Sequence, residues 1–201
     1  MRLGIFGGTF DPVHYGHLLL AETCRQELDL DEVRFLPAGN PPHKSHDISD
    51  GHARADMIKL AVSGYPEFKV DRREIRRAGP SYTVLTLDEI ASEFPESELF
   101  FLMGADSLVD FPGWREPDRI LELSTVVACN RPGHPLPDKE QLVSVTGELD
   151  TSRILMKTMP GTDISATDLR DRIDDGRGLR FLTPRAVEMF LTEHKLYAES
   201  P

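Results

Sequence analysis

The 201-residue sequence is poor in cysteine and in long apolar runs, and each scarcity excludes a class of protein. Its two cysteines, Cys24 and Cys129, are too few for a disulfide framework, so we expect free thiols in a reducing cytoplasm. No segment approaches the roughly 18 consecutive apolar residues that a membrane-spanning helix needs. The apolar run near Met1 is too short for a signal peptide. These features predict a soluble, cytoplasmic protein.

Positive charge is also scarce, because 23 Lys and Arg residues face 34 Asp and Glu residues and give a formal net charge of −11. A protein that coats nucleic acid or an anionic membrane needs a wide basic surface, so we expect neither partner. A small anionic ligand is compatible with this charge, since a few local cations and helix N-termini can hold a phosphate. The arginine cluster at 72–77 is interleaved with acids and indicates a solvated edge or a subunit contact of a homo-oligomer.

Short apolar runs alternate with helical patterns along the chain. The expected strands are 3–6, 33–36, 68–70, 99–103, 125–129 and 153–156, and the expected helices are 15–28, 52–62, 82–94, 166–174 and 183–195. We expect Ser81 to be the N-cap of the third helix. The alternation predicts parallel strands joined by helical crossovers, an α/β fold with a Rossmann-like doubly wound, mainly parallel sheet and helices on both faces. In such sheets ligands bind beyond the carboxyl ends of the strands.

The segment that follows the first strand, residues 7–17, reads GGTFDPVHYGH. Glycines at positions 7 and 8 allow a tight turn and the close approach of a ligand. His14 and His17 are three residues apart at a helix start, so their Cβ atoms should lie about 5–6 Å apart on one face. A His-x-x-His pair alone is more typical of surface or core histidines. Its position at a helix N-terminus after a Gly-Gly turn favours a phosphate site.

A second segment, residues 164–170, follows the last strand and reads ISATDLR. Ser165 and Asp168 resemble a capping box, which would place the hydroxyls of Ser165 and Thr167 near a helix N-terminus. The guanidinium of Arg170 would lie close by. If the first strand is central and the last strand lies on its far side, both segments open onto one cleft. A solvated surface cation is an equally good interpretation of Arg170 from the spacing alone.

Three further segments could contact a nucleotide or a second substrate. Gly104 and Asp106 follow the most apolar strand, and the carboxylate suits a ribose hydroxyl, although an aspartate there is equally typical of an N-cap. Residues 40–44 (NPPHK) offer cations at a rigid turn and suit a monophosphate. Residues 114–115 (WR), with 82–83 (YT), suit a flat ring, although a lone tryptophan is more often a core residue.

Several familiar motifs are missing. The first strand is not followed by Gly-x-Gly-x-x-Gly, which removes the main support for a redox dinucleotide enzyme, and there is no P-loop. His43, His46 and His52 have no cysteine at ligand spacing, so we interpret them as solvated histidines and expect no protein-held metal site.

Taken together, these segments resemble the bacterial nicotinate-nucleotide adenylyltransferases, members of the nucleotidyltransferase superfamily marked by His-x-Gly-His and Ile-Ser-x-Thr-x-x-Arg. The resemblance covers almost the whole chain. It rests, in order, on 7–17, PPHK at 41–44, PSYT at 80–83, GADS at 104–107, Trp114, RPG at 131–133 and 164–170. The first and last motifs indicate only the superfamily. PSYT and Trp114 favour the nicotinate branch over phosphopantetheine or glycerol-phosphate relatives.

This resemblance implies a single nucleotidyltransferase domain over 1–201 with a C-terminal helical part at about 165–197. It also implies a reaction in NAD biosynthesis, in which ATP and nicotinate mononucleotide give deamido-NAD and pyrophosphate, with Mg²⁺ carried by ATP. The mononucleotide phosphate would attack ATP directly, without a covalent enzyme intermediate. Two alternatives stay open: another acceptor, such as nicotinamide mononucleotide or phosphopantetheine, or a nucleotide-binding regulator without turnover. The presence of both histidines and the arginine argues against a regulator.

The resemblance also assigns roles to residues. The implied catalytic residues are His14, His17 and Arg170. The implied ATP-binding residues are Gly7, Gly8, Thr9, Phe10, His17, Gly104, Asp106, Ser165, Thr167 and Arg170. The implied mononucleotide-binding residues are Asn40, His43, Lys44, Tyr82, Thr83, Trp114 and Arg115.

Overall fold

Strand β1 (Arg2–Gly8) lies in the middle of a six-stranded sheet in the computed structural model, which describes residues 1–41, 48–130, 137, 139–147 and 149–197. The order is β3-β2-β1-β4-β5-β6, and every neighbouring pair is parallel. The other strands are β2 (Glu32–Pro37), β3 (Phe68–Val70), β4 (Glu98–Gly104), β5 (Thr125–Cys129) and β6 (Ile154–Lys157). Because the order reverses at β1, a ligand site is expected at the carboxyl end of that strand.

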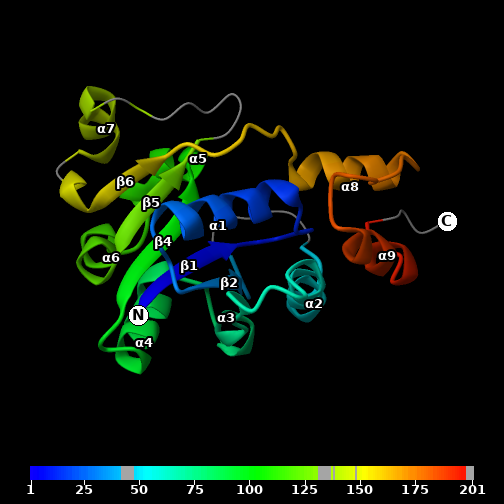
Figure 1. Cartoon of the computed structure of the whole chain (residues 1–201), viewed down its shortest axis with the longest axis horizontal. Helices are drawn as coiled ribbons and strands as arrows, with labels where there is room; N and C mark the ends of the chain where they lie inside the picture. The colour runs from blue at the N-terminus through cyan, green and yellow to red at the C-terminus, as the bar shows by residue number, and fades with distance from the viewer. Residues whose placement is uncertain (42–47, 131–136, 138, 148, 198–201) are drawn as a thin grey trace.

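Helices cover both faces of the sheet (Figure 1). One face packs against α1 (Tyr15–Glu27) and α2 (Gly51–Ala61), and α8 (Ala166–Asp174) and α9 (Arg185–Glu193) extend the same apolar core at one end of the molecule. The other face packs against α4 (Thr83–Glu93), α5 (Ala105–Asp110), α6 (Pro117–Leu123) and α7 (Lys139–Thr146). Helix α3 (Arg73–Arg76) follows β3, and single 3₁₀ turns lie at η1 (Phe111–Gly113) and η2 (Thr151–Arg153). The predicted Rossmann-like fold is confirmed.

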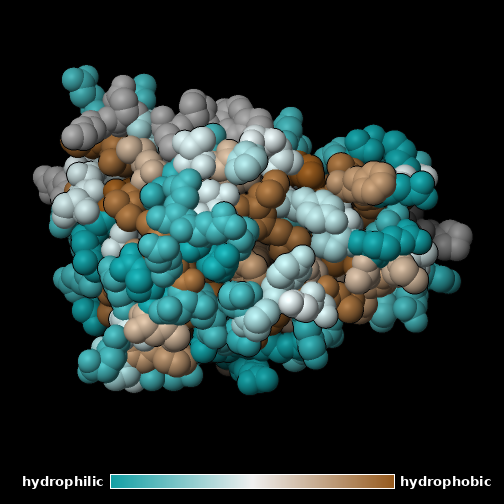
Figure 2. Space-filling view, in the orientation of Figure 1, coloured by the Kyte–Doolittle hydropathy of each residue, from teal (hydrophilic) through white to brown (hydrophobic). Residues whose placement is uncertain are grey.

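The continuous apolar run of β4 has a simple cause. Phe100 and Leu102 belong to the core beneath α1 and α2, whereas Phe101 and Met103 belong to the core beneath α4 and α6. Successive side chains of a strand point to opposite faces, so a strand covered on both faces is apolar at every position. On the outer surface, Figure 2 shows a largely hydrophilic face with apolar side chains in separate patches.

Two free thiols mark the contact between α1 and the carboxyl end of β5. Cys24 and Cys129 are both buried, and their Sγ atoms lie 3.4 Å apart without a disulfide bond. Although 105 positions separate them in sequence, the fold brings them together. The expectation of free cysteines is confirmed. Over the described ranges of the chain, no helix has both the length and the apolar character to cross a membrane.

The structure corrects three helix starts, one of which is that of α2, at Gly51 instead of residue 52. The helix expected at 82–94 begins at Thr83 with Tyr82 as its N-cap, so the expected N-cap role of Ser81 is wrong. The Ser81 hydroxyl oxygen instead accepts hydrogen bonds from the backbone N–H groups of Gly39 and Asn40, at 2.9 and 3.2 Å. The helix expected from 183 begins two residues later, after Pro184. Helices α3, α5, α6 and α7 were not expected, because four to eight residues are too few to show a helical period.

Candidate active site

The two histidines after β1 form one unit at the start of α1. His14 is the N-cap residue of α1 and is buried, and its ring stacks on that of His17 with centroids 3.7 Å apart. The backbone N–H of His14 donates to Nδ1 of His17 at 3.2 Å. Because that nitrogen accepts, the ring proton of a neutral His17 is on Nε2. The two histidine side chains therefore lie on one side of the helix start, as the spacing predicts. The hydrogen bond to Nδ1 fixes Nε2–H as the donor of the neutral His17 ring.

Two phenylalanine rings pack against the ring of His17. The Phe10 ring meets it edge-on with centroids 5.0 Å apart, and the Phe6 ring lies 6.1 Å away. Phe10 has a φ of +52° and is only 2% exposed. A Cβ at Gly8 would lie 2.9 Å from the Phe10 ring, so only glycine leaves room for this packing. Any contact of Phe10 with ATP would come from its backbone, since its side chain supports the histidine.

Helix α8 brings its motif against the loop after β1. Arg170 Nη1 donates to the backbone carbonyl oxygen of Asp11 at 2.7 Å, and Nη2 donates to the Thr167 hydroxyl at 3.2 Å. A Cβ at Gly16 would lie 3.4 Å from the carbonyl oxygen of Ile164, so the two segments also approach each other along their backbones. Ser165 is the N-cap of α8, and its hydroxyl accepts from the N–H of Asp168 at 3.1 Å. The convergence of the two motifs at one place is thus observed.

A buried arginine that the sequence analysis did not single out supports the same loop. Arg54 in α2 is 1% exposed and donates to three backbone carbonyl oxygens. These belong to Thr9 at 2.6 Å, Ala38 at 2.7 Å and Ser49 at 2.9 Å. Burial lowers the pKa of its guanidinium, while the nearby charge of Asp11 raises it. Arg54 therefore ties the carboxyl ends of β1 and β2 to the segment before α2.

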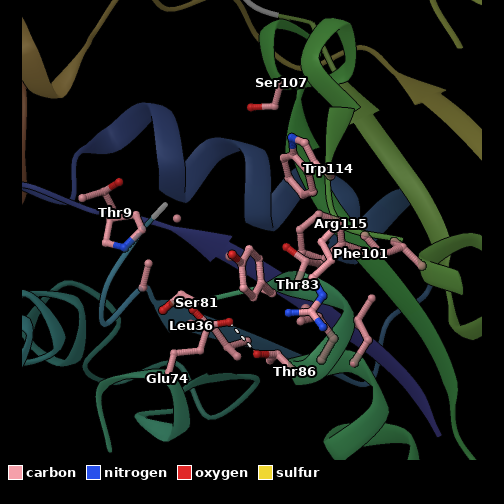
Figure 3. Close-up of a pocket in the computed structure, with 18 residues that line it drawn as sticks. Thr9, Leu36, Glu74, Ser81, Thr83, Thr86, Phe101, Ser107, Trp114 and Arg115 are labelled. Atoms are coloured by element: carbon pink, nitrogen blue, oxygen red, sulfur yellow. Dashed lines mark hydrogen bonds between the residues drawn. The ribbon is translucent and has the colours of Figure 1, made fainter. Parts of the chain in front are cut away.

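A cavity of about 210 Å³ opens at the carboxyl ends of β1, β2 and β4 (Figure 3). Trp114 lines it, and its ring meets Phe101 and Phe111 edge-on with centroids 5.9 and 5.6 Å apart. Arg115 lies over the ring of Tyr82, 4.8 Å from its centroid. The predicted site residues among its lining are Gly7, Gly8, Thr9, Tyr82, Thr83, Trp114 and Arg115. The tryptophan thus packs on the core and also faces the cavity, so the two interpretations offered for it are compatible.

The floor of this cavity carries a buried carboxyl group that no sequence pattern singled out. Glu74 in α3 accepts a hydrogen bond from the Thr86 hydroxyl at 2.6 Å, and Ser81 is a further partner (Figure 3). Burial raises the pKa of this carboxyl, against the opposing effect of the two hydroxyls and of Arg77. A Cβ at Gly39 would lie 2.2 Å from the backbone oxygen of Glu74, so glycine is required where the loop after β2 passes α3.

The remaining predicted residues fall in three groups. Gly104 ends β4 and precedes α5, in whose first turn Asp106 lies, next to the cavity-lining Ser107. Asn40 is exposed, one residue before the cavity-lining Pro41. His43 and Lys44 lie outside the described residues, so their predicted contact with a monophosphate remains a prediction. In the part of the chain that the structure describes, no group of three or more His, Cys, Asp or Glu could hold a metal ion.

Comparison with known proteins gives concordant results. The family model described as cytidylyltransferase-like matches residues 5–172. Two curated relatives named "Probable nicotinate-nucleotide adenylyltransferase" are each 44% identical over 98% of this chain. They come from Thermomicrobium roseum, with 91% of its length covered, and from a strain of Thermus thermophilus, with 100% covered.

Solved structures show the same fold at low sequence identity. The nicotinic acid mononucleotide adenylyltransferase of Plasmodium falciparum, solved in complex with NaAD, superposes with a TM-score of 0.79 at 15% identity. The same protein in complex with APC gives 0.77 at 14% identity. The alignments cover 98% of this chain in both cases, and 97% and 96% of the respective solved chains.

Proposed function

The chain belongs to the nicotinate-nucleotide adenylyltransferases of the cytidylyltransferase-like family, which makes it an enzyme of NAD biosynthesis that transfers the adenylyl group of ATP to nicotinate mononucleotide, and we propose how its site performs this transfer. A phosphate oxygen of the mononucleotide attacks the α-phosphorus of ATP and forms the new P–O–P bond. The bond from the α-phosphorus to the β-phosphate oxygen breaks, and pyrophosphate leaves with the electron pair.

The proposal rests on the loop after β1, because this loop contacts two separate groups of proposed site residues. Residues 7–9 line the cavity beside Trp114, whereas Asp11 holds Arg170 and residue 14 begins the stacked histidine pair. The acceptor ring would therefore bind near residues 7–9, and the ATP phosphates would bind near Arg170 and the histidine pair. This arrangement supports direct attack, since the acceptor phosphate and the ATP α-phosphate would meet at the loop.

On the phosphate side, the chain supplies donors rather than a nucleophile. His17 offers Nε2–H, and Arg170 offers a guanidinium whose Nη1 is fixed by the Asp11 carbonyl. Ser165 and Thr167 add hydroxyls at the N-terminus of α8. Donors held in place before reaction stabilise the charge that grows on the leaving pyrophosphate. Gly104 and Asp106, at the start of α5, are proposed to meet the adenosine ribose.

On the acceptor side, Trp114 and Tyr82 offer aromatic faces to the pyridine ring, and Arg115 places a cation over Tyr82. Thr83 begins α4, so the N-terminus of that helix faces the cavity and suits the nicotinate carboxylate. We propose that Asn40, His43 and Lys44 complete this side near the mononucleotide phosphate.

We propose that Mg²⁺ enters with ATP. The donor set described here consists of imidazole, guanidinium, hydroxyl and backbone N–H groups, which suit phosphate oxygens. No cluster of metal ligands lies among the described residues, so triphosphate oxygens would supply the ligands. When bound, the ion neutralises phosphate charge. We also propose a cytoplasmic location, which the two buried free thiols support.

The test is a pyrophosphate-release assay with Mg²⁺-ATP and three separate acceptors: nicotinate mononucleotide, nicotinamide mononucleotide and phosphopantetheine. We expect release with nicotinate mononucleotide and much slower release with the other two. Faster release with another acceptor would contradict the acceptor assignment. ATP binding without release with any acceptor would favour a nucleotide-binding regulator.

A further inference from the structure

Besides Arg54 and Arg170, a residue that follows α9 also contacts the loop after β1. The Tyr197 hydroxyl donates to Oδ1 of Asp11 at 2.5 Å, and the Ser49 hydroxyl donates to the same oxygen. The two hydroxyl oxygens lie 3.1 Å from each other. Figure 1 shows why the contact forms, because α9 lies beside α2 and beneath α8 at one end of the molecule. Nothing in the sequence pattern around Tyr197 pointed to it.

The two hydroxyl groups are the hydrogen-bond donors that hold the carboxyl group of Asp11 in place. Asp11 is only 2% exposed, and its other oxygen, Oδ2, is buried without a hydrogen-bond partner among the described residues. The guanidinium of Arg54 lies near this carboxyl group, and the guanidinium of Arg170 lies near Tyr197 and donates to the Asp11 carbonyl. Burial next to Asp11 raises the pKa of Tyr197, so its hydroxyl keeps its proton and stays a donor at neutral pH. A buried carboxylate that lost one of its two donors would no longer be held in one position.

The position of Asp11 matters for Arg170. Arg170 Nη1 donates to the Asp11 carbonyl oxygen at 2.7 Å, and Nη2 donates to Thr167. The side chain and the carbonyl of Asp11 belong to one residue, so fixing the first restricts the second. Two hydrogen bonds therefore connect Tyr197 to Arg170 through Asp11.

We propose that Tyr197 is a positioning residue for ATP, whose hydroxyl fixes Asp11 so that the Asp11 carbonyl orients the Arg170 guanidinium toward the ATP phosphates. The inference rests on the proposed role of Arg170 in the reaction. It differs from a purely structural role, in which the hydroxyl would only hold the C-terminal residues onto the domain. A structural role predicts lower thermal stability without a selective effect on one substrate.

The first experiment is Tyr197→Phe, which removes one hydroxyl and keeps the ring. We expect the KM for ATP to rise about tenfold, the scale of one hydrogen bond to a charged group. The KM for nicotinate mononucleotide should change less than about twofold. Tyr65→Phe is the matched control, because Tyr65 is 61% exposed and its ring packs against Phe68. Equal changes in both KM values, or no change in either, would overturn the proposal.

A second variant and a double-mutant cycle make the test independent of stability. Ser49→Ala removes the other donor to Asp11 and should raise the KM for ATP in the same selective way. In an Arg170→Ala background, Tyr197→Phe should cause no further loss of kcat/KM for ATP, because the residue through which it acts is gone. Additive losses would contradict the proposal. Full activity of Arg170→Ala alone would instead refute the assigned role of Arg170, which separates the two failures.

Discussion

Glu74 in α3 and Thr86 in α4 are joined by a hydrogen bond of 2.6 Å at the floor of the cavity. Arg77 donates to the same threonine oxygen at 2.9 Å and pairs with Glu89. The carboxyl group is buried, and burial raises its pKa. A group of this kind binds its proton more tightly in the folded chain than in the unfolded chain.

This difference predicts a pH-dependent stability. Between the ordinary pKa of about 4.5 and the raised pKa of Glu74, the native chain binds more protons than the unfolded chain. The contribution of Glu74 to the free energy of unfolding should therefore be full below about pH 4.5 and should be lost as pH rises through the raised value. Urea unfolding of wild type and Glu74→Gln at several pH values checks this, with Glu96→Gln as an exposed control. A difference between the two proteins that does not change with pH would contradict it.

His17→Ala should lower kcat by roughly 10²–10³-fold, the scale of losing one preorganised donor at a developing charge. Its fold should remain intact, which a thermal melt would show. The matched control is His194→Ala, because His194 is exposed and its ring stacks on Phe190 of α9. Turnover near wild type in the His17 variant would remove this residue from the mechanism.

Trp114→Ala should mainly raise the KM for nicotinate mononucleotide and leave the dissociation constant of ATP unchanged. The reason is that Trp114 lines the cavity, whereas the proposed phosphate donors His17 and Arg170 are not among its lining residues. Steady-state kinetics and direct ATP titration give the two numbers. Because the ring also packs on Phe101 and Phe111, Trp114→Phe serves as the variant that keeps part of the packing. A collapse of melting temperature with unchanged KM would instead favour a purely structural role.

Arg54→Met should lower the free energy of unfolding by about 3–5 kcal/mol, because a buried charge and its partners are disrupted together. Three backbone carbonyl oxygens would lose their donor, and Asp11 would lose a nearby positive charge. Denaturant unfolding measures the change. Arg185→Met is the control, since its side chain is 69% exposed, and it should change stability by less than about 0.5 kcal/mol. A similarly small change at Arg54 would show that the three hydrogen bonds contribute little.

The sheet could be predicted because its strands are short, mainly apolar runs between turn residues. The residues 99–103, for example, are apolar throughout and became the core of β4. The convergence of the two motifs could also be predicted, since both follow strands and carboxyl ends of parallel strands meet at one edge. The single-domain organisation and the individual substrate contacts of the site residues remain predictions.

The supporting residues could not be predicted for a common reason. Arg54, Glu74 and Tyr197 act through contacts with segments distant in sequence, and no local pattern marks such contacts. Ser81 is a case in which a local pattern was present but a tertiary contact overrode it. A serine before a helix is a good N-cap candidate, yet the neighbouring β2 loop offered Gly39 as a partner and tertiary structure decided the outcome.

The loop after β1 is fastened by residues that come 38 to 186 positions later in the chain. Thr183 also donates to the carbonyl of Val13, and the N–H of Tyr15 to that of Leu182. A fragment that ended after β3 would contain both histidines but would lack Arg170, Thr183 and Tyr197, which hold the loop that leads into them. Such a fragment should therefore not bind nucleotide, and binding should return only when the complementary fragment associates with it. Nucleotide binding at this loop would then report that the whole domain has assembled.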